Sequence, residues 1–187
     1  MPIERKINNH RVGWIEIICG GMFSGKTKAL ISRLKEAESA QQKIAIFKPV
    51  IDTRYHAEKI VSHDASALDA KPISDAKIML EGIEDAHVVA VDEAQFFGQE
   101  IVRVVEQLAN AGKRVIVAGL DMDYEGKPFG PMPSLLSVAN YITKLHAQCV
   151  LCGGEASYSY RKDISKDQVA IGEKDKYEAR CRNCFHS

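Results

Sequence analysis

The segment WIEIICGGMFSGKTKALISRL, residues 14–34, decides the fold of this 187-residue chain. A short apolar run leads into GGMFSGKT at residues 20–27, and apolar residues at helical spacing follow it. The middle part fits the pattern G-x-x-x-x-G-K-[ST], in which backbone N–H groups at a helix N-terminus surround phosphate oxygens. A chance match in a glycine-rich turn is the alternative, but strand, loop and helix stand in the required order. We therefore predict a nucleotide-binding phosphate loop, and we favour ATP because the chain has no N-K-x-D guanine signature.

Short β-branched runs alternate with helix-like segments beyond this loop. This alternation predicts a parallel sheet with flanking helices, a P-loop (RecA-like) α/β domain over residues 14–148, whose strand order the pattern does not reveal. Gly112 is the expected C-cap of the second helix. The predicted strands are residues 14–19, 43–47, 87–91, 114–119 and 141–148, and the predicted helices are residues 25–42 and 98–112.

Composition and charge limit the choice of partners. Lysine and arginine number 25, as do aspartate and glutamate, so no global field attracts nucleic acid or an anionic membrane. No apolar run is long enough for a signal peptide or a membrane span. We expect a cytoplasmic protein with no membrane or nucleic-acid partner, in which residues 1–13 form a flexible tail.

Four of the five cysteines form two C-x-x-C pairs, which is the spacing of a closed structural zinc site in a reducing compartment. Residues 149–187 hold too few apolar side chains for a core of their own, so we expect the metal to hold this C-terminal lobe together. Its loss should disorder the lobe and leave ATP binding at residues 20–27 largely intact. Cys19 is expected to be a buried thiol. The predicted zinc ligands are Cys149, Cys152, Cys181 and Cys184.

The stretch VDEAQFF, residues 91–97, places two adjacent carboxylates at the end of a predicted strand. Together with Lys26 at the phosphates and the Thr27 hydroxyl, Asp92 would serve ATP and Mg²⁺. Neighbouring side chains on a strand point opposite ways, so Glu93 is free to act as a general base. A nucleic-acid motor would use this glutamate to activate water, and a small-molecule kinase would use it on a hydroxyl. Phe96 and Phe97, which end this stretch, stack on a base in the kinase interpretation or belong to the core.

Five stretches in order carry a resemblance to a known family. They are GGMFSGKT (20–27), DTRY (52–55), DEAQFF (92–97), GLDMDYEGKPFG (119–130) and the lobe with CVLC (149–152) and GEKDKYEARCRNC (172–184). This ordered set resembles the thymidine kinases of the cellular, zinc-containing type. The family often has proline where this chain has Gly21, and phenylalanine where it has Tyr124.

The resemblance implies phosphorylation of the 5′-hydroxyl of thymidine by ATP, with Glu93 as the proton acceptor, in a homotetramer. It also implies that the C-terminal lobe is a lasso, which would close over the nucleoside and contact thymine through the backbone of residues 168–172. The alternative is a P-loop ATPase with a zinc ribbon that acts on nucleic acid. The residues implied for ATP and Mg²⁺ are Gly20, Gly21, Met22, Phe23, Ser24, Gly25, Lys26, Thr27, Asp52, Arg54, Asp92, Glu93, Ala94 and Gln95. Those implied for thymidine are Met22, Phe96, Leu120, Tyr124, Gln168, Val169, Ala170, Ile171, Gly172 and Tyr177.

Overall fold

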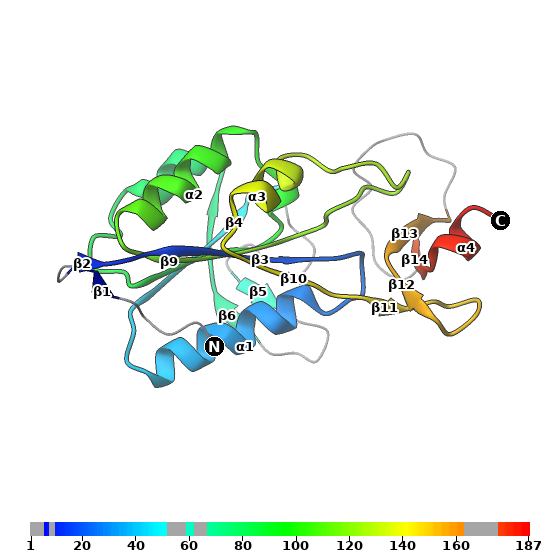
Figure 1. Ribbon diagram of the computed structural model, residues 1–187, viewed down its shortest axis with the longest axis horizontal. Helices are drawn as coiled ribbons and strands as arrows, with labels where there is room; N and C mark the ends of the chain where they lie inside the picture. The colour runs from blue at the N-terminus through cyan, green and yellow to red at the C-terminus, as the bar shows by residue number, and fades with distance from the viewer. Residues whose placement is uncertain (1–5, 8–9, 52–58, 62–66, 163–175) are drawn as a thin grey trace.

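A computed structural model describes residues 6–7, 10–51, 59–61, 67–162 and 176–187. Figure 1 shows a central sheet with α1 (Lys26–Ser39) on one face and α2 (Glu100–Asn110) and α3 (Met132–Val138) on the other. A small lobe of short strands lies beyond one end of this sheet, next to the C-terminus (Figure 1). The α/β domain with an appended C-terminal lobe is therefore confirmed.

Within the described residues, six strands form a sheet in which every pairing is parallel. This confirms the prediction of a parallel sheet and adds the strand order. The strand before the phosphate loop and the strand before the two carboxylates are separated by one strand, β9. In sheet order the strands are β10 (Tyr141–Lys144), β3 (Trp14–Cys19), β9 (Arg114–Gly119), β8 (Val88–Val91), β4 (Ile44–Pro49) and β7 (Lys71–Ile73).

The register of the central strands brings distant segments to one edge of the sheet. Cys19 pairs with Gly119, and Val91 pairs with Val117. The phosphate loop, the residues after Val91 and the residues after Gly119 thus all leave the sheet at its carboxyl edge. Ligands of open parallel sheets bind outside this edge.

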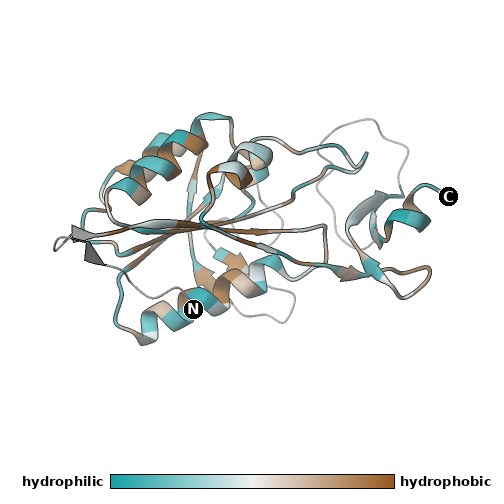
Figure 2. Cartoon of the chain, in the orientation of Figure 1, coloured by the Kyte–Doolittle hydropathy of each residue, from teal (hydrophilic) through white to brown (hydrophobic). Residues whose placement is uncertain are grey.

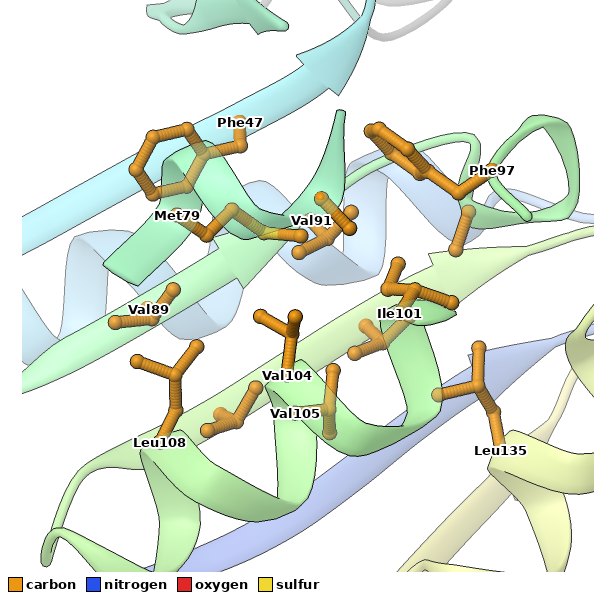
Figure 3. Close-up of a cluster of buried hydrophobic side chains, with 14 of the residues drawn as sticks. Phe47, Met79, Val89, Val91, Phe97, Ile101, Val104, Val105, Leu108 and Leu135 are labelled. Atoms are coloured by element: carbon orange, nitrogen blue, oxygen red, sulfur yellow. The ribbon is translucent and has the colours of Figure 1, made fainter. Parts of the chain in front are cut away.

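The core lies between the sheet and its helices. All four residues of β8 have an exposed fraction of 0%, as expected of a strand covered on both faces. Figure 2 shows the apolar colour concentrated along these strands and on the inward sides of the helices. In Figure 3, Ile101, Val104, Val105 and Leu108 of α2 point toward Val89 and Val91 of the sheet. Residues at this spacing form the apolar side of an amphipathic helix, which explains why α2 was recognisable.

Gly112 and Cys19 behave as expected. The second helix ends before Gly112, whose φ of 84° is the left-handed conformation that ends many helices. Cys19 is 1% exposed, and burial raises the pKa of its thiol to about 11. No described helix is both long and apolar enough to cross a lipid bilayer.

Other elements did not follow the sequence pattern. The edge strand β7 contains Pro72, a residue that sheets accept only at edges, and it leads into the 3₁₀ helix η1 (Ala76–Leu80). The single strand predicted over residues 141–148 is in fact two strands, β10 and β11 (Ala147–Gln148), that belong to different sheets. Between them Leu145 donates its N–H to the carbonyl of Cys19 at 2.8 Å, and the chain then leaves the main sheet.

The described residues of the lobe form two short antiparallel pairs and one helical turn. β11 pairs with β12 (Glu155–Ala156), and β13 (Tyr158–Arg161) pairs with β14 (Tyr177–Arg180), which precedes α4 (Arg182–Phe185). Elsewhere in the described chain, two further antiparallel pairs lie outside the main sheet. They are β1 (Lys6–Ile7) with β2 (His10–Arg11), and β5 (Lys59–Val61) with β6 (Ala67–Asp69).

Candidate nucleotide and metal sites

The phosphate loop connects the end of β3 to the start of α1. A side chain at Gly20 would place its Cβ 2.2 Å from the carbonyl oxygen of Leu145, so only glycine fits there. Gly25 caps the helix with a φ of 86°, and the helix begins at Lys26. The Lys26 ammonium group donates to the carbonyl of Gly21 at 2.8 Å, and the Ser24 hydroxyl donates to the same oxygen at 2.8 Å. The predicted loop therefore has the strand, turn and helix that phosphate binding requires.

Asp92 lies beside this loop, at the carboxyl end of β8. Its Oδ2 accepts a hydrogen bond from the Thr27 hydroxyl at 3.0 Å, and its Oδ1 accepts one from the backbone N–H of Glu93 at 3.0 Å. The residue is 5% exposed, and burial, with the nearby charge of Glu93, raises the pKa of its carboxyl group to about 7. A hydroxyl and a buried carboxylate in contact are oxygen ligands of the kind Mg²⁺ prefers.

Glu93 has the left-handed backbone conformation, with φ 53° and ψ 40°, directly before the 3₁₀ helix η2 (Ala94–Phe96). Non-glycine residues in this region are uncommon and cluster at functional sites. The conformation keeps its side chain half-buried while its neighbour Asp92 is buried. The two adjacent carboxylates thus occupy different environments, but the cause is the turn at Glu93 and not the alternation along a strand expected from the sequence, because β8 ends at Val91.

Gln95 connects the carboxylate of Glu93 to the loop after β9. Its side-chain N–H donates to Oε2 of Glu93 at 2.5 Å, and its Oε1 accepts from the backbone N–H of Leu120 at 2.9 Å. The residue is 2% exposed. This amide fixes the position of Glu93 relative to Leu120, a linking role that the sequence did not reveal.

The two phenylalanines of this stretch separate into different roles. Phe97 is 7% exposed and belongs to the main core, whereas Phe96 is only half-buried. The ring of Phe96 meets that of Phe129 edge-on, with centroids 5.8 Å apart. Phe96 is therefore the ring of the two that remains open to a flat ligand.

Arg161 of β13 brings together two of the predicted thymidine residues. Its guanidinium carbon lies 4.6 Å from the ring centroid of Tyr124 and 5.7 Å from that of Tyr177. Arg161 is 7% exposed, and such cation–π contacts gain strength when they are shielded from water. The sequence around residues 156–162 carried no signal for this contact.

The four predicted zinc ligands do converge. Their sulfur atoms lie within 4.8 Å of one another, and those of Cys152 and Cys181 are 3.7 Å apart. Zn–S bonds of about 2.3 Å in a tetrahedron place sulfurs roughly 3.8 Å apart, so this donor set fits zinc. Hydrogen bonds from the backbone, chiefly that of Cys181, lower the pKa of Cys149 to about 6, which favours the thiolate that a metal binds. In the part of the chain that the structure describes, no other group of three or more such side chains has this geometry.

Other predicted residues lie outside the described part of the chain. They are Asp52 and Arg54 of the predicted ATP site, and Gln168, Val169, Ala170, Ile171 and Gly172 of the predicted thymidine site.

A phosphate loop at the carboxyl edge of a parallel sheet, with the carboxylate of Asp92 hydrogen-bonded to it, defines a P-loop nucleotide-binding protein. This protein also carries a lobe with a four-cysteine metal site. The family follows from the sequence relationships. A family model described as thymidine kinase matches residues 13–185, and the chain belongs to the thymidine kinase family.

Its relatives are similar over nearly their whole length. A thymidine kinase of Rhodothermus sp. (strain ITI 518) is 51% identical over 187 residues, which cover 99% of this chain and 88% of that protein. A thymidine kinase of Bacteroides thetaiotaomicron is 51% identical, with 94% and 88% of the two chains covered. One of Bdellovibrio bacteriovorus is 49% identical, with 94% and 87% covered.

Among solved structures, domain III of the Thermotoga maritima replication initiation protein DnaA aligns with a TM-score of 0.42 at 16% identity. The alignment covers 70% of this chain and 54% of that one, and a likeness this low bears on no functional question.

Proposed function

We propose that this chain transfers the γ-phosphate of ATP to the 5′-hydroxyl of thymidine. One observation of the site carries the proposal. Asp92 accepts a hydrogen bond from Thr27 of the phosphate loop, while the side chain of the adjacent Glu93 occupies a separate, half-buried position. Membership of the thymidine kinase family supports the choice of acceptor. The nucleic-acid ATPase is not favoured, because relatives of about 50% identity over nearly the whole chain are thymidine kinases.

Each group has a defined task in this reaction. Residues 20–27 bind the triphosphate, with the ammonium group of Lys26 at its charged oxygens. Thr27 and Asp92 would hold Mg²⁺, which supplies positive charge to the phosphates. Glu93 accepts the proton of the 5′-hydroxyl as its oxygen attacks the γ-phosphorus and ADP leaves. Gln95 donates to Glu93 and so orients the carboxylate toward the acceptor.

The two parts of the chain divide the substrates between them. We assign ATP to residues 14–148, and we assign closure over the nucleoside to residues 149–187. The half-exposed ring of Phe96, with Tyr124, Leu120, Met22 and Tyr177, supports a flat pyrimidine ligand between the parts. We further propose that the protein is a cytoplasmic homotetramer and that residues 1–13 take no part in catalysis.

The acceptor is tested by following ADP release and nucleoside phosphorylation in the purified protein with Mg²⁺ and ATP. Thymidine should stimulate ADP release and yield its 5′-monophosphate, whereas single- or double-stranded DNA should not. Glu93→Gln should lower turnover by about 10²–10⁴-fold while ATP binding persists, because it removes the proton acceptor and keeps the shape. Glu106→Gln on the exposed side of α2 is the matched control and should behave like the unmodified protein. Stimulation of ADP release by DNA without phosphorylation of thymidine would refute the proposal. Near-normal turnover of Glu93→Gln would show that Glu93 is not the general base.

A further inference from the structure

The C-terminal lobe makes a direct hydrogen bond to the phosphate loop. The backbone N–H of Met22, in the middle of the loop, donates to the hydroxyl of Ser159 at 2.9 Å. Ser159 lies on β13, 137 residues further along the chain, and is 4% exposed. A buried hydroxyl on the lobe therefore holds one of the backbone N–H groups of the loop in a fixed direction.

Phe23 provides a second contact from the same loop. Its side chain packs against the small apolar cluster of the lobe, which includes Cys149, Ala156 and Ala179 and has two other cysteines at its border. Phe23 has a positive φ of 65°, an unfavourable conformation for a bulky residue. Because such a conformation persists only when its surroundings hold it, the packing of this ring against the metal lobe supports the shape of the loop.

Gly21 is the third residue of the phosphate loop that lies against the lobe. A side chain here would place its Cβ 3.1 Å from the carbonyl oxygen of Ser157 and 3.4 Å from the hydroxyl of Ser159. Three consecutive loop residues, 21 to 23, thus meet the lobe within the described part of the chain. From the sequence alone we expected ATP binding to be largely independent of the lobe, and these contacts argue against that independence.

We propose that the metal-loaded lobe holds the phosphate loop in its nucleotide-binding shape, with Ser159 and Phe23 as positioning residues, so that zinc binding and ATP binding are coupled. The apolar cluster of the lobe is small, and structural zinc supplies much of the folding free energy of such lobes. Loss of the metal would release Ser159 and the surface under Phe23, and the loop would then have to be ordered by ATP binding alone. The inference rests on the proposed nucleotide site but not on the identity of the phosphate acceptor.

The coupling is measured on the full chain with Mg²⁺ and a fluorescent ATP analogue, in the absence of thymidine. A zinc-selective chelator removes the metal and is itself removed before Mg²⁺ and nucleotide are added. The metal-depleted protein should bind the analogue at least about fivefold more weakly, and one equivalent of zinc should restore the affinity. Coupling is reciprocal, so saturating Mg²⁺ and ATP should raise the affinity of the protein for zinc by the same factor.

Ser159→Ala tests the hydrogen bond without touching the metal ligands. With zinc bound, this variant should bind the analogue about threefold to tenfold more weakly, the range expected for one lost hydrogen bond to a backbone N–H. In metal-depleted protein the same substitution should have no further effect, because the contact is already lost. Ser159→Thr keeps the hydroxyl and should restore affinity. Ser157→Ala is the matched control, because its hydroxyl contacts His146 and not the loop.

Equal affinity of loaded and depleted protein, or of Ser159→Ala and Ser157→Ala, would overturn the coupling. The proposed function fails in a different way, as an absence of thymidine phosphorylation in the zinc-loaded, unmodified protein. If circular dichroism shows that metal depletion unfolds the chain, the comparison of the two serine variants with zinc bound decides alone whether the lobe holds the phosphate loop in its binding shape.

Discussion

Asp92 lies in an environment that costs stability, which is consistent with the Mg²⁺-binding role proposed for it. The carboxyl group is buried beside Glu93, and burial raises its pKa from the ordinary value of 3.8 to about 7. Because the folded protein binds this proton more tightly than the unfolded chain, the group costs stability as pH rises from about 4 through 7. A cation at the site would offset that cost, which is typical of functional carboxylates.

Asp92→Asn should therefore stabilise the protein while abolishing Mg²⁺-dependent turnover. At pH 8, in buffer without nucleotide or Mg²⁺, the melting temperature should rise by about 2–6 °C, since 1 kcal/mol corresponds to roughly 2–4 °C in a chain of this size. At pH 5 the difference should shrink, because the native carboxyl group is then already neutral. Thermal melting across this range is the measurement, with the exposed Asp69→Asn as control. A variant that is less stable than the unmodified protein at pH 8 would contradict the explanation.

The elements around the phosphate loop are held together by one buried carboxylate. Glu16 of β3 is 2% exposed and accepts hydrogen bonds from Arg114 of β9 at 2.7 and 3.2 Å and from Arg33 of α1 at 2.8 Å. Arg33 also donates to the Thr143 hydroxyl of β10 at 2.7 Å. Burial alone raises the pKa of Glu16, but the hydrogen bonds from Arg114 and Trp14 outweigh it and lower the pKa. Three strands and the helix that follows the phosphate loop thus share one hydrogen-bond network.

Glu16→Ala should lower the free energy of unfolding by about 3–5 kcal/mol, because it leaves the buried Arg114 without its partner. Since the folded pKa of Glu16 is lowered, its contribution to stability is present above its ordinary pKa of 4.5 and is lost as pH falls through the folded pKa. Urea denaturation at pH 7.5 and at pH 4 should therefore give a smaller difference at the lower pH. Glu38→Ala, at an exposed position of α1, is the control. A loss below about 1 kcal/mol at pH 7.5 would show that the network does not hold these elements together.

The main domain and the lobe meet at Arg161 as well as at the phosphate loop. The guanidinium group lies against Tyr124, on the loop after β9, and against Tyr177 on β14 of the lobe. It thereby positions two rings that the proposed function places at the thymidine site. A cation over two aromatic faces contributes about 0.5–2 kcal/mol at each face.

Arg161→Leu should raise the KM for thymidine about tenfold, which corresponds to roughly 1.4 kcal/mol, and should change the KM for ATP by less than about twofold. Steady-state kinetics with each substrate varied in turn measures this, after metal analysis has verified one zinc per chain. Arg182→Leu removes a comparable contact with Tyr158 elsewhere in the lobe and serves as the control. Equal effects of the two variants, or a loss confined to ATP, would show that Arg161 does not position the nucleoside site.

Features built from neighbouring residues were readable in the chain. The phosphate loop, the Asp92–Glu93 pair and the two C-x-x-C turns each lie within a few residues, and their chemistry depends on local spacing. The main strands and both long helices were also recognisable, because apolar periodicity records which side of an element is buried. Pro72 in β7 and the break after Lys144 escaped this reasoning, since an edge strand and a change of sheet depend on the neighbours of the element.

Arrangements of distant residues were settled by packing. No short stretch of sequence indicates the order of the six strands or the hydrogen bonds that link Glu93 through Gln95 to Leu120. None indicates the cation–π contacts of Arg161 with two tyrosines. The same holds for the bond from Met22 to Ser159, which joins residues 137 positions apart. Local patterns record how each segment is buried, but the partner of a buried group is selected by the free energy of the whole packed chain. For that reason the sequence by itself indicated the chemistry of this protein, whereas the contacts that couple the phosphate loop to the C-terminal lobe were decided by the tertiary structure.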